Sequence, residues 1–275
     1  EHVQELAYSD DGKYLAASSW NGLVWVYDAA DWSEVAHMNA GDWIVAMPMW
    51  VPGEHVLTLK SYGKLSDPDP QEQWAFDVRT GQETTAPYQF GHLRSHDGVH
   101  RVTPNGLDEG GYDLHETDAL PQRTISHAGT WDPIQCKAFS ADGTKLFLGA
   151  QQNLYVVDPV TARVTDKVMD ATGRFFDLAA SPDGSYLAAA SFSRKLDYLG
   201  PFGEKRPHEL CVWRTADRKI ILGRQMETYI DALAWSPDGR RLVASLEPCD
   251  GNFAHGQSEL AVFAMGPRDE PLPGE

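Results

Sequence analysis

The chain has 275 residues, of which 42% are hydrophobic and 23% are charged, and its formal net charge is −17. A chain of this length and composition can bury a core without disulfides or a metal, and its acidic surface disfavours nucleic acids and anionic membranes as partners. No apolar stretch approaches the roughly 18 residues that cross a membrane. The three cysteines, Cys136, Cys211 and Cys249, match neither a zinc pattern nor a disulfide framework, which favours a reducing compartment such as the cytoplasm.

A repeated segment starts near residue 3 and returns along the chain. Its clearest copies end in Ser-x-Asp-Gly, at residues 9–12, 140–143, 181–184 and 236–239, and weaker copies end at Gly53 and Gly98. The marker glycines at 12, 53, 98, 143, 184 and 239 are 41, 45, 45, 41 and 55 residues apart. A period of about 40–45 residues is typical of a four-stranded propeller blade.

Each copy predicts its strands in chain order. Asp-Gly between two apolar runs predicts a hairpin, because glycine adopts the positive φ that the turn requires. Third strands with an apolar–aromatic pattern are predicted at residues 23–28, 74–77, 154–158, 210–214 and 260–263. Short fourth strands follow at 34–37, 83–85, 163–165 and 219–222. No long segment repeats its apolar residues every 3.6 positions, as an amphipathic helix would, so the predicted fold class is all-β. We predict a propeller of four-stranded antiparallel blades, with six repeats visible and six or seven blades in the full ring.

The Ser-Pro-Asp-Gly hairpins at 181–184 and 236–239, with the strand endings Val24–Asp28 and Val212–Arg214, resemble the WD40 family. The resemblance covers nearly the whole chain and predicts one propeller domain over residues 1–275. Its copies cover about 1–40, 41–88, 89–130, 131–172, 173–226 and 227–266, and 267–275 form a tail. The Trp-Asp ending of that family is degenerate here, and six-bladed propellers of the TolB type share the Ser-Pro-Asp-Gly hairpin and remain an alternative.

The last copy has no evident fourth strand, because the tail is rich in proline, which cannot donate to a strand ladder. The resemblance implies that an outer strand from the other terminus closes the ring. We expect this strand, with or without a seventh blade, to precede Glu1. The alternative is a six-bladed ring that is left unlatched.

Function in such a fold is expected in loops on one face. The loops between second and third strands are expanded at Ser61–Gln71, Ser193–His208 and Glu247–Ser258, and the longest combines basic and aromatic residues, which are typical of binding hot spots. The resemblance implies a non-catalytic scaffold that binds a partner protein or peptide. The predicted partner-binding residues are Arg194, Lys195, Tyr198, Phe202, Lys205, Arg206, Tyr62, Phe253, Trp20, Trp43 and Trp131. A solvated loop is the competing interpretation for residues 193–208.

The sequence contains no nucleophile elbow and no phosphate-binding glycine loop, so we predict no enzyme and no cofactor. His92, His96 and His100 have a helical metal-ligand spacing, but Asp97-Gly98 between them predicts a hairpin, so no metal is expected there. Polar residues near the first strands, Gln4, Gln135, Asp177 and Asp231, are expected to line the upper channel. Two alternatives remain open: a propeller enzyme that binds a small ligand or metal, and a structural propeller domain of a larger protein.

Overall fold

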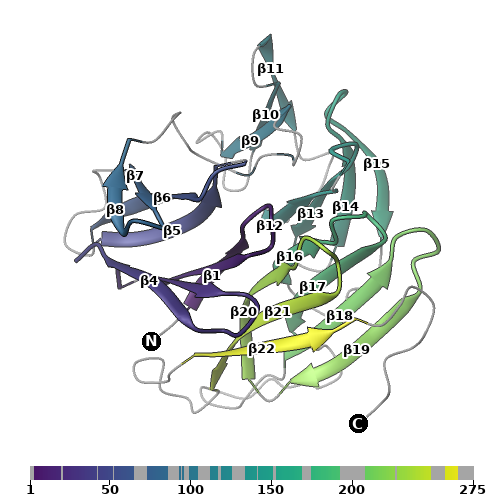
Figure 1. Cartoon of the computed structure of the whole chain (residues 1–275). Helices are drawn as coiled ribbons and strands as arrows, with labels where there is room; N and C mark the ends of the chain where they lie inside the picture. Colours follow the sequence, from purple (N-terminus) through teal and green to yellow (C-terminus); the bar gives the residue numbers. More distant parts are fainter. Residues whose placement is uncertain are drawn as a thin grey trace, which may run out of the picture. The chain divides into compact units, whose positions relative to one another are not determined.

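The computed structural model describes most of the chain. It covers residues 3–19, 21–41, 43–51, 53–64, 73–85, 93, 95, 99–104, 112–116, 119–125, 134–140, 142–150, 153–168, 175–192, 208–226, 228–248 and 258–265. Within these residues all regular secondary structure is β-strand (Figure 1). The prediction of an all-β chain is therefore confirmed for the described part.

The strands form six sheets within the described residues, antiparallel in every strand pair whose register is known, and four of these sheets have four strands. The first sheet contains β1 (Val3–Tyr8), β2 (Tyr14–Ser19), β3 (Leu23–Asp28) and β4 (Glu34–Asn39). The second contains β5 (Trp43–Trp50), β6 (Val56–Lys64), β7 (Gln73–Asp77) and β8 (Gln82–Thr84). The fourth contains β12 (Ile134–Phe139), β13 (Leu146–Ala150), β14 (Asn153–Asp158) and β15 (Arg163–Val168). The fifth contains β16 (Phe175–Ala180), β17 (Tyr186–Phe192), β18 (His208–Arg214) and β19 (Ile220–Met226).

The other two sheets have three strands each. The third contains β9 (His100–Pro104), β10 (Tyr112–Glu116) and β11 (Ala119–Ile125), and the sixth contains β20 (Thr228–Trp235), β21 (Arg241–Pro248) and β22 (Glu259–Ala264). Strands β10 and β11 were not predicted, because their sequences are polar and β11 contains Pro121. Proline is tolerated there because β11 lies at the edge of its sheet.

The Ser-x-Asp-Gly segments form the turn between the first and second strands. In the first sheet the Ser9 hydroxyl donates to Asp11 Oδ1 (2.7 Å) and accepts from the Tyr14 N–H (2.9 Å), while Gly12 adopts a φ of 70°. The same pair of bonds recurs at Ser140, Ser181 and Ser236, where the hydroxyl–carboxylate distances are 2.6, 2.8 and 2.5 Å. Because one serine and one aspartate satisfy the polar groups of the whole turn, this short motif is enough to specify a hairpin.

A second repeated turn joins the third and fourth strands. Asp28, Asp77 and Asp158 accept hydrogen bonds of 2.8, 2.9 and 2.8 Å from the N–H two residues ahead. Four residues after each aspartate the chain adopts positive φ, at Trp32 (63°), Gly81 (69°) and Ala162 (55°). Only the second sheet has glycine at this position. In the other two turns a residue with a side chain adopts positive φ, which is unfavourable for residues other than glycine.

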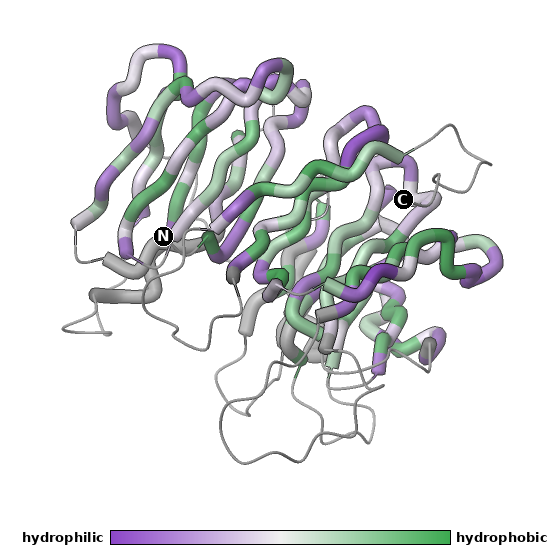
Figure 2. Tube along the Cα trace, turned by 90° about the horizontal axis from the view of Figure 1, so that it is seen from below, coloured by the Kyte–Doolittle hydropathy of each residue, from purple (hydrophilic) through white to green (hydrophobic). Residues whose placement is uncertain are grey.

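The cores lie between neighbouring sheets. One cluster joins the first and second sheets through residues such as Val26, Trp50 and Leu59, and another joins the fourth and fifth through Phe147, Phe175 and Leu187. Figure 2 shows hydrophobic residues along the strands and hydrophilic residues at the turns. Cys136 and Cys211 are buried, whereas Cys249 lies outside the described residues.

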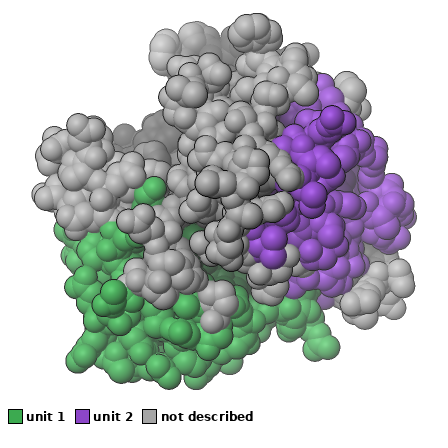
Figure 3. Space-filling model, turned by 90° about the horizontal axis from the view of Figure 1, so that it is seen from above, with its two compact units in different colours: residues 1–91, 234–264 green, residues 92–233, 265–275 purple. Residues whose placement is uncertain are grey.

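The chain divides into two compact units, residues 1–91 with 234–264 and residues 92–233 with 265–275 (Figure 3). The boundary falls within β20. A single propeller domain over residues 1–275, with the copy boundaries given above, stays a prediction.

Candidate interaction surface

The strand ends locate the three expanded connections. Strand β6 ends at Lys64 and β7 begins at Gln73, β17 ends at Phe192 and β18 begins at His208, and β21 ends at Pro248 and β22 begins at Glu259. The equivalent connections in the first and fourth sheets are short, from Ser19 to Leu23 and from Ala150 to Asn153. Each long connection leaves its own sheet at the end opposite to that sheet's first hairpin turn.

Most of the predicted partner-binding residues lie outside the described residues. These are Trp20, Trp131, Arg194, Lys195, Tyr198, Phe202, Lys205, Arg206 and Phe253. Tyr62 lies in β6 and Trp43 begins β5, but their side chains are not described. Their roles in binding stay predictions.

The prediction that the second loop begins at Ser61 is wrong. Strand β6 continues to Lys64, because β5 offers partners for it: Val45 faces Ser61 and Trp43 faces Lys64. Tyr62 is therefore part of a strand rather than of a loop. Residues 61–64 are held in the strand by pairing with β5. The sequence of residues 61–64 alone therefore could not predict that β6 continues to Lys64.

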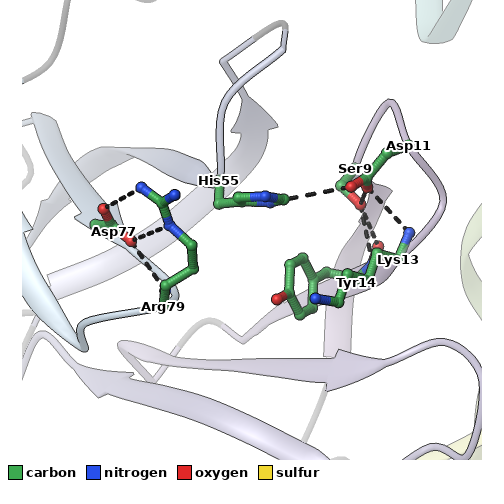
Figure 4. A network of polar contacts seen from close by, with 7 residues as sticks. All are labelled: Ser9, Asp11, Lys13, Tyr14, His55, Asp77 and Arg79. Carbon is green, nitrogen blue, oxygen red and sulfur yellow. Dashed lines mark hydrogen bonds and ion pairs between the residues drawn. The ribbon is translucent and has the colours of Figure 1, made fainter.

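A polar network joins the turns of the first two sheets. His55 points from the second sheet toward Asp11 of the first, with 4.0 Å between Nδ1 and Oδ2, and its ring meets Tyr14 edge-on at 5.6 Å (Figure 4). Tyr14 in turn stacks on Trp50 at 5.8 Å, and the Trp50 indole donates to the Ala7 carbonyl oxygen (3.0 Å). These side chains therefore act as packing and hydrogen-bonding groups between two sheets.

The carboxylates at these turns have hydrogen-bond partners nearby. The Arg79 guanidinium donates to the Asp77 carboxylate (3.0 Å) and lowers its pKa. Partial burial acts to raise the pKa of Asp11, but hydrogen bonds from Ser9 and from the Lys13 N–H, together with the nearby His55, lower it overall. Both carboxylates are thus held in the ionised form, which suits structural hydrogen bonding rather than proton transfer at neutral pH.

Asp177 was expected to line the channel, and the structure gives its carboxylate two backbone partners. It accepts from the Leu178 N–H (2.8 Å) and from the Leu233 N–H (2.7 Å), so it ties β16 to β20. The first strands of three sheets also carry a register irregularity at the equivalent place, after Val3, Ile134 and Phe175. A carboxylate engaged in this way stabilises the contact between two sheets.

Of the histidine series, the structure describes His100, which lies in β9. The Ser95 N–H donates to the His100 carbonyl oxygen (2.9 Å) and the His100 N–H donates to Ser95 Oγ (2.8 Å), which is hairpin pairing, as predicted. His100 is buried and stacks on Phe139 at 6.4 Å, whereas His92 and His96 lie outside the described residues. Among the residues that the structure describes, no group of three or more His, Cys, Asp or Glu side chains is arranged to hold a metal ion.

The tryptophans are mainly packing residues where they are described. Trp74 and Trp213 pack against core clusters. Sequence reasoning missed Trp50 and Trp235, which are 7% and 6% exposed, and Trp32, which lies under the Arg241 guanidinium at 5.7 Å. The described part of the chain also has no helix with the length and hydropathy that a membrane crossing requires.

Comparison with known proteins agrees with this architecture. A family model described as WD domain, G-beta repeat, matches residues 1–28, and no curated protein sequence matches the chain. The β-propeller domain of Cps50 (Swd1) from Myceliophteria thermophila is similar, with a TM-score of 0.52 and 14% identity over 88% of this chain and 93% of that one.

Two further solved structures are similar to the chain. A chain of the Mitotic Checkpoint Complex has a TM-score of 0.57 and 18% identity over 96% of this chain and 74% of that one. Hydrazine synthase from Kuenenia stuttgartiensis has a TM-score of 0.57 and 17% identity over 90% of this chain and 77% of that one. At these identities the likeness concerns the fold, which is that of a β-propeller, and the match to the WD repeat model covers residues 1–28.

Proposed function

We propose that the chain is a non-catalytic scaffold that binds a partner protein or peptide, in the cytoplasm, through the three expanded connections. The observation that carries this proposal is the position of the insertions. All three fall between a second and a third strand, at the end of the sheet opposite to that sheet's first hairpin turn. Insertions at one end of rigid strands are the usual place for binding residues.

The residue types in the longest insertion support a protein partner. Residues 193–208 contain four basic residues, and Tyr198 and Phe202 lie between them in the sequence. Arginine and aromatic residues are enriched at the centres of protein interfaces. The net charge of −17 disfavours nucleic acid as the partner.

The opposite ends of the sheets offer less for recognition. The carboxylates of their turns, such as Asp11, Asp142 and Asp238, accept hydrogen bonds from neighbouring serines and backbone N–H groups. These carboxylates already serve to close their own turns. This favours the insertions as the binding surface.

The test is a loop variant with a matched control. Changing Arg194, Tyr198, Phe202 and Arg206 to Ala removes two basic and two aromatic side chains from the longest insertion. The control changes Arg163, Arg224, Val160 and Ile220 to Ala, which removes two basic and two apolar side chains that are exposed on or beside outer strands. Partners recovered with the unmodified chain and identified by mass spectrometry should be lost only with the loop variant.

Recovery of the same partners by all three proteins would contradict the proposal. Metal analysis of the purified protein addresses the enzyme alternative. One metal ion bound per chain, with retention that depends on Asp177 or Asp231, would favour that alternative instead.

A further inference from the structure

The second strands of five sheets share one equivalent position, which the pairing with the third strand defines. In four sheets the residue there is small and buried, and the residue opposite it is aliphatic: Ser18 with Val24, Gly149 with Leu154, Ala190 with Leu210, and Ser245 with Leu260. The second sheet differs, because it has Lys60 at this position, opposite Gln73. Lys60 is partly buried.

The other sheets show why a small residue suits this position. The Ser245 hydroxyl reaches the Val3 carbonyl oxygen of the first sheet at 3.1 Å. A Cβ added at Gly149 would lie 3.1 Å from Phe175 Cβ of the fifth sheet. The side chain of Lys60 therefore starts from a backbone position that is closed to water in four sheets.

The Lys60 amine lies in a setting that disfavours its charged form. In the described part of the chain, no ion pair or hydrogen bond joins this amine to another residue. Burial lowers the pKa of Lys60, because the ammonium loses hydration and no nearby carboxylate replaces it.

Lys13 provides the opposite case within the same chain. It is exposed, and its Nζ lies 5.0 Å from the centre of the Tyr14 ring. Its interactions with Tyr14 and with the carboxylates of Asp28 and Asp11 raise the pKa of Lys13. The two lysines therefore differ in how easily each amine loses its proton.

An uncharged lysine amine is a nucleophile toward carbonyl carbon, and desolvation is one way of activating it. With an aldehyde, the Nζ lone pair forms a bond to the carbonyl carbon. The carbonyl oxygen then leaves as water with the two amine hydrogens, and a carbon–nitrogen double bond remains. This step needs no oxidant or reductant, and a partly buried amine on a strand favours a small aldehyde.

We infer that Lys60 is a covalent modification site of this chain, at which small aldehydes form an imine. The site lies within β6 and does not use the three expanded connections, so it goes beyond the function proposed above.

The probe is acetaldehyde in limiting amount, added at neutral pH to the full chain with sodium cyanoborohydride, which reduces the imine to a stable ethyl-lysine. Peptide mass spectrometry measures the modified fraction of each lysine. The fraction at Lys60 should exceed that at Lys13 about threefold or more. In the chain unfolded in urea the two fractions should be equal, because the burial of Lys60 is lost.

A charge introduced opposite the amine tests the physical cause. Gln73→Glu places a carboxylate opposite Lys60, which favours the ammonium and should lower the modified fraction about threefold. Gln82→Glu is the matched control, since it adds the same charge at an exposed residue of β8, and it should leave the fraction unchanged. Circular dichroism confirms that both variants keep the fold.

Three results would overturn the inference. The first is a modified fraction at Lys60 that is no larger than at Lys13 in the folded chain. The second is a difference that persists in the unfolded chain, since it would then come from the local sequence rather than from burial. The third is an equal effect of Gln73→Glu and Gln82→Glu.

Discussion

The Ser245 hydroxyl donates a hydrogen bond of 3.1 Å to the Val3 carbonyl oxygen, although 242 residues separate them. The Val3 N–H donates to Ser258 Oγ at 2.9 Å. The backbone N–H and C=O of Val3 are therefore both bonded to serine hydroxyls in or next to the last sheet. Ser245 is fully buried and Val3 is 7% exposed. The first strand of the chain is therefore anchored to the last sheet by side chains.

Ser245→Ala should lower the free energy of unfolding by about 1–2 kcal/mol, because it leaves the buried Val3 carbonyl without this donor. Urea unfolding followed by tryptophan fluorescence measures the change. Ser33→Ala, at an exposed turn position, is the control and should stay within about 0.5 kcal/mol of the unmodified protein. Equal stability of both variants would contradict the anchoring role.

The Ser-x-Asp-Gly turns predict a pH dependence. Hydrogen bonds from the Ser140 hydroxyl (2.6 Å) and the Thr144 N–H (3.0 Å) lower the pKa of Asp142 in the folded state. The stabilisation is complete above the unfolded-state pKa of about 3.9 and is lost as the pH falls through the lower folded-state value. The stability difference between the unmodified protein and Asp142→Asn should therefore narrow as the pH is lowered from about 5 to about 2.

Urea unfolding at several pH values measures this difference, and carboxyl NMR reports the pKa of Asp142 directly. A difference that is constant over the whole range would mean that the carboxylate charge does not contribute to the turn.

Gly149 permits a close approach of the fourth and fifth sheets. A Cβ added there would lie 2.5 Å from Cys136 Sγ and 3.1 Å from Phe175 Cβ. Gly149→Ala should therefore destabilise the protein by about 1–3 kcal/mol through overpacking. Gly223→Ala in β19 is the control, since nothing lies closer than 3.6 Å to its added Cβ.

A double-mutant cycle identifies the clash. Removing the sulfur with Cys136→Ala should reduce the cost of Gly149→Ala, so the two changes together cost less than their sum. Additive costs would place the clash at Phe175 or Leu178 rather than at the thiol.

Trp32 combines an unfavourable backbone with a favourable contact. Its φ is 63°, and its ring lies under Arg241, which also donates to the Ala29 carbonyl oxygen at 2.6 Å. Trp32→Ala loses the ring and keeps the strained backbone, whereas Trp32→Gly loses the ring and relieves the strain. The glycine variant should therefore be more stable than the alanine variant by about 1 kcal/mol in urea unfolding. An alanine variant that is as stable as the glycine variant would show that φ is not strained at this turn.

Several elements could be predicted from the sequence because their chemistry is local. The third strand at 23–28 agrees with β3, and the glycines at 12, 143, 184 and 239 have positive φ as expected. A Ser-x-Asp-Gly turn closes within six residues, so the short sequence contains all of its partners. The strands β10 and β11 have no such signal, and pairing with their neighbours alone keeps them in a sheet.

Part of the candidate interaction surface could also be predicted from the sequence, and part could not. The positions of the expanded connections were readable as interruptions of the repeat. The strand ends agree with them, except that β6 extends to Lys64, β21 extends to Pro248 and β18 begins at His208. The 40% exposure of Val262 was not readable, because Val26, Val156 and Val212 at the equivalent third-strand position look alike in sequence and are at most 9% exposed.

By itself, the sequence determined the repeat, the order of the strands and the chemistry of the turns, since these depend on residues a few positions apart. Only the tertiary structure decided that Asp177 joins two sheets and that Ser245 holds Val3. Those features depend on pairs of residues that are 56 and 242 positions apart. Neither kind of information is present in any local pattern of the chain.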